Sequence, residues 1–140
     1  MKEGQNRTIA VFYCQNVPES GESHRQALEK EYGIKIRLFP IPCSGRLDPL
    51  HLLKALEEFA DAAYVITCPE GACRYFEGNK RAKKRVERAR SLIESIGLEG
   101  DRIDILIGSV VEQKTLAELS GVLMERARNL SPSPVHRDKV

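Results

Sequence analysis

Four short β-type runs, each followed by a segment of helical periodicity, limit the folds open to this chain. Residues 8–13 and 62–67 are apolar almost throughout, which is typical of strands covered on both faces. Residues 34–38 alternate between Ile or Leu and a basic residue, so this strand is expected at a sheet edge. Residues 103–107 form the fourth expected strand. Strands that alternate with helices predict a parallel sheet with right-handed crossovers, here a three-layer, flavodoxin-like α/β fold with strand order 2-1-3-4.

The helices between and after these strands carry their own start and stop signals. The first is expected from Glu22 to Tyr32 and ends before Gly33, and the second begins at the pair Asp48-Pro49 and runs to about residue 59. The last is expected from a capping box of Ser109 with Glu112 to about residue 129. The third, about 77–96, has one buried stripe: Ala82, Val86, Ala89, Ile93 and Ile96. We therefore expect one domain over residues 1–129 and a flexible tail over 130–140.

Composition narrows the class of protein further. The 140 residues are 41% hydrophobic and 30% charged with a net charge of +2, which favours a globular protein and makes no case for nucleic-acid binding. The sequence has no apolar run of about 18 residues, the length of a membrane span, and its polar start is unlike a signal peptide. We therefore expect a cytoplasmic protein, in which grouped cysteines more often bind metal or do redox work than form structural disulfides.

Cysteines follow three of the four expected strands. Cys14 comes directly after the first strand, Cys43 follows the second, and Cys68 follows the third, with Cys73 five residues later. The carboxyl ends of parallel strands share one edge of a sheet, and ligands bind where the strand order reverses. The pattern favours a shared metal or cluster site. A redox or catalytic thiol, and cysteines that are simply small buried hydrophobes, stay open as alternatives.

The residues around these cysteines suit anionic sulfur. Gly45 and Gly71 let the backbone turn tightly and offer N–H groups, and the adjoining helix starts add positive charge. Arg46 and Arg74 are candidates for a supporting role next to the ligands, with ordinary surface positions as the alternative. Four thiolates suit zinc and iron–sulfur centres equally well, so the spacing leaves the metal open.

The stretch from Cys68 to Arg74 also has the form of a phosphate loop, with a cysteine and an arginine separated by five residues. In cysteine-dependent phosphatases and arsenate reductases such a loop places a nucleophilic thiolate below an oxyanion. Glu70 puts a carboxylate inside this loop, and Tyr75 stands where Ser or Thr is usual. The phosphatase interpretation also leaves Cys14 and Cys43 unexplained, so it is the weaker one.

The positions of the histidines and of the basic residues in the sequence allow two further assignments. His24, His51 and His136 are expected at the surface, away from the cysteines. Residues 74–90 contain eight Lys or Arg and two Glu, so the third helix has a basic face. That face is a candidate docking surface for an acidic partner, with a merely solvated helix face as the alternative.

Taken together, two motifs give the chain a family resemblance. The run from Cys43 to Pro49, and the later run from Cys68 through Cys73-x-Tyr75 to Asn79, resemble the delta subunit of methyl-viologen-reducing hydrogenase. The resemblance extends from Thr8 to about residue 128. It implies an electron-transfer subunit with a [2Fe-2S] cluster and no bond-making chemistry of its own. It also implies a hetero-oligomer in which a heterodisulfide-reductase-A-like flavoprotein and a dehydrogenase or hydrogenase subunit are the partners.

The resemblance also assigns the ligands of the cluster. Cys43, Cys68 and Cys73 match the family motifs directly, and Cys14 stands at the first cysteine position. The family usually has a further cysteine three residues on, where this chain has Val17, and histidines of the third motif are replaced by Pro69 and Arg74. Four thiols remain, which is enough for a [2Fe-2S] centre with no spare ligand.

Overall fold

The computed structural model describes residues 8–14, 17, 19–41, 48–67, 78–107 and 114–130, with backbone alone at 34, 78–80 and 107. The strands are β1 (Ile9–Cys14), β2 (Ile36–Ile41), β3 (Ala62–Thr67) and β4 (Ile103–Ile107). The helices are α2 (Glu22–Tyr32), α3 (Pro49–Glu58), α4 (Gly78–Ser95) and α5 (Leu116–Ala127), and short 3-10 turns η1 (Gly33–Lys35) and η3 (Gly100–Arg102) precede β2 and β4.

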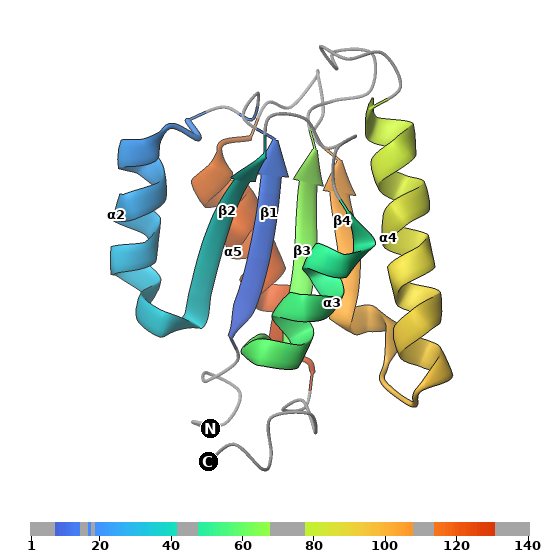
Figure 1. Cartoon of the computed structure of the whole chain (residues 1–140). Helices are drawn as coiled ribbons and strands as arrows, with labels where there is room; N and C mark the ends of the chain where they lie inside the picture. Colours follow the sequence, from blue (N-terminus) through green and yellow to red (C-terminus); the bar gives the residue numbers. More distant parts are fainter. Residues whose placement is uncertain are drawn as a thin grey trace.

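The four strands form one parallel sheet in the order β2-β1-β3-β4, as the sequence predicts (Figure 1). Ile9 is level with Ile36 of β2 and with Ala62 of β3, so three strands begin together at the amino edge of the sheet. β1 and β3 are buried along their whole length. β2 alternates between buried and exposed residues at its start, as expected of an edge strand, although it begins at Ile36 because residue 34 belongs to η1.

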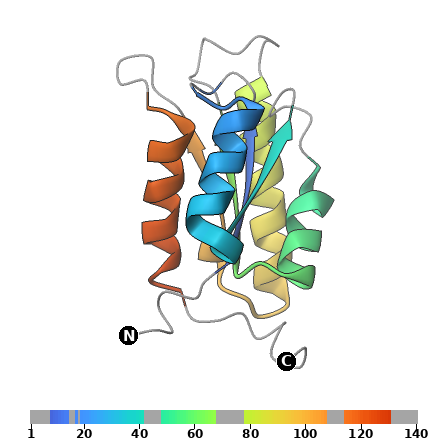
Figure 2. The ribbon, with the colours of Figure 1, turned by 90° about the vertical axis from the view of Figure 1, so that its left-hand side faces the viewer.

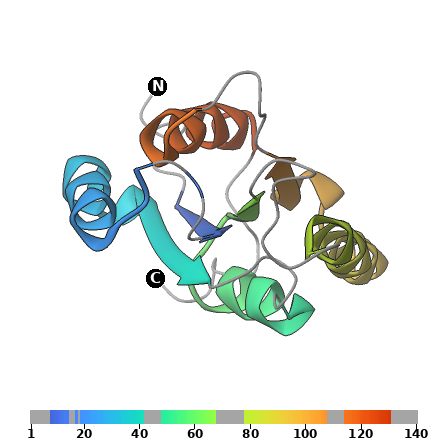
Figure 3. The ribbon, with the colours of Figure 1, turned by 90° about the horizontal axis from the view of Figure 1, so that it is seen from above.

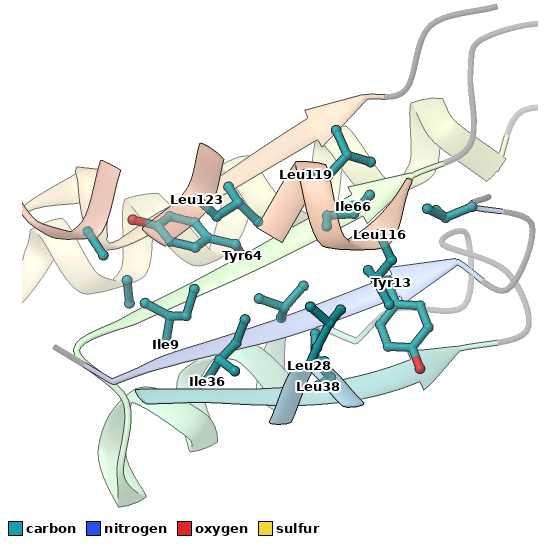
Figure 4. Packing of buried hydrophobic residues seen from close by; sticks show 14 of the residues in the cluster. Ile9, Tyr13, Leu28, Ile36, Leu38, Tyr64, Ile66, Leu116, Leu119 and Leu123 are labelled. Atoms are coloured by element: carbon teal, nitrogen blue, oxygen red, sulfur yellow. The ribbon is translucent and has the colours of Figure 1, made fainter. Parts of the chain in front are cut away.

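Helices cover both faces of the sheet and make the three layers of the fold. α2 and α5 lie on one face, and α3 and α4 lie on the other (Figures 2 and 3). Each face has its own apolar core. Ile9, Val11 and Tyr13 of β1 face α2 and α5, where Leu28, Leu119 and Leu123 meet them (Figure 4). Ala10 and Phe12 face the other way, into the core beneath α3 and α4.

Buried polar groups connect the strands at the amino edge. The Asp61 carboxylate accepts a hydrogen bond of 2.9 Å from the backbone N–H of Thr8. The Arg102 guanidinium, which is fully buried, donates through Nη1 to the Asp61 carbonyl at 3.0 Å and through Nε to the Glu99 carboxylate at 2.8 Å. These bonds satisfy charges that would be costly to bury alone, so they fix the starts of β1, β3 and β4 relative to one another.

The end of α4 corrects one expectation. Ala82, Val86, Ala89 and Ile93 are buried as predicted, but Ile96 is 73% exposed. The helix stops at Ser95, and Gly97 adopts φ of +94°. The N–H groups of Gly97 and Leu98 donate to the carbonyls of Glu94 and Ile93, which is a Schellman motif. The turn directs Leu98 into the core in place of Ile96.

The start of α5 also differs from the sequence-based expectation. The helix begins at Leu116, and its capping box pairs Thr115 with Glu118 instead of Ser109 with Glu112. Both pairs fit the same sequence pattern, Ser or Thr followed by Glu at the third position, so the pattern alone does not choose between them. Ser109 and Glu112 lie outside the described residues, as does the predicted tail from residue 131 onward. Leu130, the first residue of that predicted tail, packs against the core.

Candidate metal centre

The candidate centre lies at the carboxyl edge of the sheet. There β1 ends at Cys14, β2 at Ile41 and β3 at Thr67. Cys14 is level with Ile41, and its neighbour Tyr13 is level with Ile66, so the end of β1 lies between the ends of β2 and β3. The four strand ends point to the same side of the molecule (Figure 1). A residue that follows any of these three strands therefore starts from this edge.

Of the residues predicted for the site, the structure describes Cys14 alone. Cys43 is two positions beyond the last residue of β2, and Cys68 is the next residue after β3. They lie outside the described residues, together with Cys73, Gly45, Arg46, Gly71 and Arg74. Among the residues that are described, no three His, Cys, Asp or Glu side chains gather closely enough to hold a metal ion. The convergence of the four thiols accordingly stays a prediction.

Cys14 differs from its predicted position in one respect. It is the last residue of β1 instead of the first residue after it, and it is 1% exposed. Its carbonyl accepts a hydrogen bond of 3.0 Å from the N–H of Val17, so the backbone of Val17 lies next to the end of the strand. The side chain belongs to the core on the α2 and α5 face, together with Tyr13 and Val17. A free thiol buried in this core fits a metal ligand shielded from solvent, and it fits a small buried hydrophobe equally well.

Val17 stands where the family motif usually has a further cysteine. Its side chain is 4% exposed and packs in the same core as Cys14. A valine suits this buried apolar position, and Cys14 is the one thiol that the described part of the edge contributes.

The start of α3 has less positive charge to offer than the sequence suggests. Asp48 caps the helix, and its carboxylate accepts a hydrogen bond of 2.9 Å from the N–H of Leu50. The carboxylate takes up one of the helix-start amides and offsets part of the helix dipole. The start of α3 therefore has less of its dipole available to stabilise anionic sulfur than an uncapped helix start would have.

Two aromatic contacts near the edge were missed by sequence reasoning. The imidazole of His51 stacks on Phe12, two residues before Cys14, with ring centroids 6.4 Å apart. Phe12 in turn stacks on Phe39 of β2 at 5.0 Å. His51 is at the surface, as predicted, but it lies nearer to the end of β1 than we expected. The Pro49 start of α3 was the available signal, because it puts His51 in the first turn of a helix that begins at this edge.

On the face of the sheet that α2 and α5 cover, Tyr13 lies near the ion pairs made by Arg25. Arg25 of α2 pairs with Glu22 and, at 2.9 Å, with Glu29. Burial raises the pKa of Tyr13, and the positive charge of Arg25 partly opposes this. The phenol therefore stays neutral next to Cys14 at physiological pH.

The fold and the order of the cysteines in the sequence define a class: small α/β proteins in which cysteines follow successive strands of a parallel sheet. Within that class the chain belongs to the family of the methyl-viologen-reducing hydrogenase delta subunit, whose family model matches residues 9–131. This membership confirms the resemblance drawn from the cysteine motifs.

Individual relatives give the same result over nearly the whole chain. The chain is 32% identical to the iron-sulfur subunit of the F420-non-reducing hydrogenase vhu of Methanocaldococcus jannaschii, covering 91% of this chain and 95% of that protein. It is 32% identical to the protein of the same name from Methanopyrus kandleri, covering 91% and 97%. A 101-residue match, 31% identical, covers 72% of this chain but 13% of a subunit of the ferredoxin:CoB-CoM heterodisulfide reductase of Methanosarcina mazei.

Proposed function

We propose that the protein is an electron-transfer subunit that holds a [2Fe-2S] cluster through Cys14, Cys43, Cys68 and Cys73. One observation carries the proposal: Cys14 ends the strand that lies between the ends of β2 and β3, and the other three cysteines follow those two strands. Parallel strands in this order bring residues that are distant in sequence to one edge. The relatives named as iron-sulfur subunits support the class of cofactor.

The partners follow from the relatives. Two are subunits of a hydrogenase, and another contains a similar segment inside a much longer subunit of a heterodisulfide reductase. We infer that this chain belongs to a hetero-oligomeric oxidoreductase. In it, electrons pass between a hydrogenase or dehydrogenase subunit and a heterodisulfide-reductase-A-like flavoprotein. None of the helices in the described ranges is long and apolar enough to cross a membrane.

The residues of this chain have distinct tasks in that role. The bound cluster supplies one-electron redox chemistry. Cys14 would hold it from the centre of the sheet, where Tyr13 and Val17 restrict access of water from the α2 and α5 side. Gly45 and Gly71 would offer backbone amides, and Arg46 and Arg74 positive charge, which favours the reduced, more negative state.

Anaerobic purification tests the cofactor directly. We expect about two irons and about two sulfides per chain, charge-transfer absorption in the visible range, and an EPR signal on reduction by one electron. Colourless protein with one zinc per chain would replace the electron-transfer role by a zinc-stabilised scaffold. Metal-free protein whose phosphate-ester hydrolysis disappears in Cys68→Ser would support the phosphatase interpretation instead.

Substitution at Cys14 tests the ligand that the structure describes. Cys14→Ser is expected to lose most of the visible absorption and bound iron while its far-UV circular dichroism stays that of the folded protein. Adding Val17→Cys should restore part of the cluster, because the backbone of residue 17 is hydrogen-bonded to that of residue 14. Val17→Cys alone is the control and should leave the iron content unchanged. A Cys14→Ser protein with the full spectrum would remove Cys14 from the ligand set.

A further inference from the structure

An apolar groove of about 670 Å³ lies between α3 and α4, on the face of the sheet away from α2 and α5. Leu50 and Leu53 of α3 form one wall, and Leu92 of α4 with Ile96 forms the other. Leu56, Ile93 and Leu98, which are buried, make the floor. Because these floor residues belong to the core beneath α3 and α4, the shape of the groove is fixed by the fold.

The groove gathers the exposed apolar side chains of the described molecule. Within the described ranges, three large hydrophobic residues are exposed: Leu50 at 67%, Leu92 at 43% and Ile96 at 73%. All three line this one groove. Apolar side chains scattered singly over a surface are ordinary, but a contiguous set in a groove is typical of a binding site for another chain.

A basic stripe continues the groove along α4. Arg88, Arg85 and Arg81 precede Leu92 by 4, 7 and 11 positions, so they lie on the same side of the helix. Arg81 and Arg88 are exposed, and Arg85 is half-buried. The stripe leads from Leu92 toward the start of α4, which is the helix end that adjoins the cysteine loop in the chain. Lys54 adds one positive charge at the groove and Glu57 one negative charge.

The chemistry of the surface selects among possible occupants. A second copy of this chain is a poor match, because a two-fold contact would set the arginines against Leu and Ile or against arginines, and Glu57 is the one carboxylate among the described residues that line the groove. The segment 131–140 is also a poor match: it contains His136, Arg137, Asp138 and Lys139, and its large apolar side chains are limited to two valines. A helix with leucine-like residues on one side and carboxylates on another matches both the groove and the stripe.

We propose that the groove between α3 and α4 binds an acidic amphipathic helix of another subunit. The apolar side of that helix packs on Leu50, Leu92 and Ile96, and its carboxylates pair with the exposed Arg88 and Arg81. A helix seated in this way runs along α4 toward the carboxyl edge of the sheet. The proposal rests on the proposed function in one respect: the helix belongs to a subunit of the same oxidoreductase complex.

Site-directed cross-linking identifies the occupant. A photoreactive benzoylphenylalanine replaces Leu92 in the full chain, the complex is purified with its other subunits, and the peptides joined by irradiation are sequenced. The expected product joins position 92 to a helical segment of another subunit that is net negative and apolar on one side. A product with a second copy of this chain, a product with a neutral or basic segment, or no product at this position would each overturn the proposal.

Charge reversal tests the stripe. Arg88→Glu is expected to weaken assembly with the partner subunit by about tenfold or more at low salt, and the weakening should diminish as salt is added. Lys83→Glu is the matched control, because Lys83 is exposed on another side of α4 and the charge change is the same. Equal effects of the two variants would refute a docking role for the stripe.

The electron-transfer proposal and the docking proposal can be contradicted independently of each other. The visible absorption of the isolated chain reports on the cluster, and we expect both variants to retain it. A colourless chain whose assembly is still weakened by Arg88→Glu would remove the electron-transfer proposal and leave the docking surface. A normal spectrum with assembly unaffected by Arg88→Glu would remove the docking surface and leave the electron-transfer proposal.

Discussion

Burial of the single side chain of Tyr64 makes the stability of the fold depend on pH. It lies in the middle of β3, is 1% exposed, and packs among the residues of α5 (Figure 4). Burial raises its pKa to about 12, and the negative charge of Asp104 adds to the increase. A tyrosine in an unfolded chain ionises near pH 10. The folded state, in which the pKa of Tyr64 is about 12, therefore favours the neutral phenol.

This difference predicts alkaline sensitivity. The stabilisation is complete below pH 10, and it is lost as the pH rises through about 12, because the unfolded chain then releases a proton that the folded chain keeps. We expect the free energy of unfolding to fall by up to about 3 kcal/mol from this group. Urea titrations at pH 9 and pH 11 measure the loss. Tyr64→Phe should lose less over the same interval, and an equal loss in both proteins would contradict the assignment.

At the scale of an element, the turn that ends α4 predicts how substitutions at Gly97 change the stability of the protein. Gly97 has φ of +94°, and no atom lies within 4 Å of the position that a Cβ would occupy. The cost of a side chain there is therefore conformational and not steric. Gly97→Ala should lower the free energy of unfolding by about 1 kcal/mol, and Gly97→Asn by less, because asparagine enters the left-handed region more easily. Chemical denaturation measures both, and equal costs would show that the turn is not held in this conformation.

The same turn explains why some local features escaped prediction. Periodicity placed Ile96 in the buried stripe because it continues the spacing of Ile93, but spacing does not reveal where the helix stops. The Schellman bonds reverse the chain at Gly97 and exchange Ile96 for Leu98. At α5, two capping-box patterns compete in the sequence, and the structure uses Thr115. In both cases the local pattern alone does not choose between the alternatives.

Larger features of the fold were predictable because they depend on whole segments. The continuous burial of β1 and β3 and the alternation in β2 follow from runs of several residues, and they determine the order of the strands. The site was predictable only where it follows from that order, at the end of β1. The burial of Cys14 and the contact of His51 with Phe12 depend on side-chain packing, for which the sequence supplies only partial signals such as the Pro49 helix start.

For the whole molecule, the proposed ligands predict a connection between cofactor and stability. Three separate segments would be joined at one edge of the sheet, so metal binding contributes to folding. We expect the chelated protein to unfold at a temperature lower by on the order of 10 °C than the loaded protein, measured by calorimetry under anaerobic conditions. In Cys14→Ser the two temperatures should nearly coincide. Equal temperatures for the loaded and chelated wild-type protein would indicate ligands held rigidly without the metal.

The two ends of the folded domain leave this molecule on the same side. β1 starts at Ile9 next to Asp61 and Arg102, and α5 runs back from the carboxyl edge to end at Ala127 near that same amino edge (Figure 1). Such a unit can be inserted into a longer polypeptide without a linker crossing its carboxyl edge. A fusion through either end of this folded unit would therefore be attached at the amino edge of the sheet, opposite the edge at which β1, β2 and β3 end.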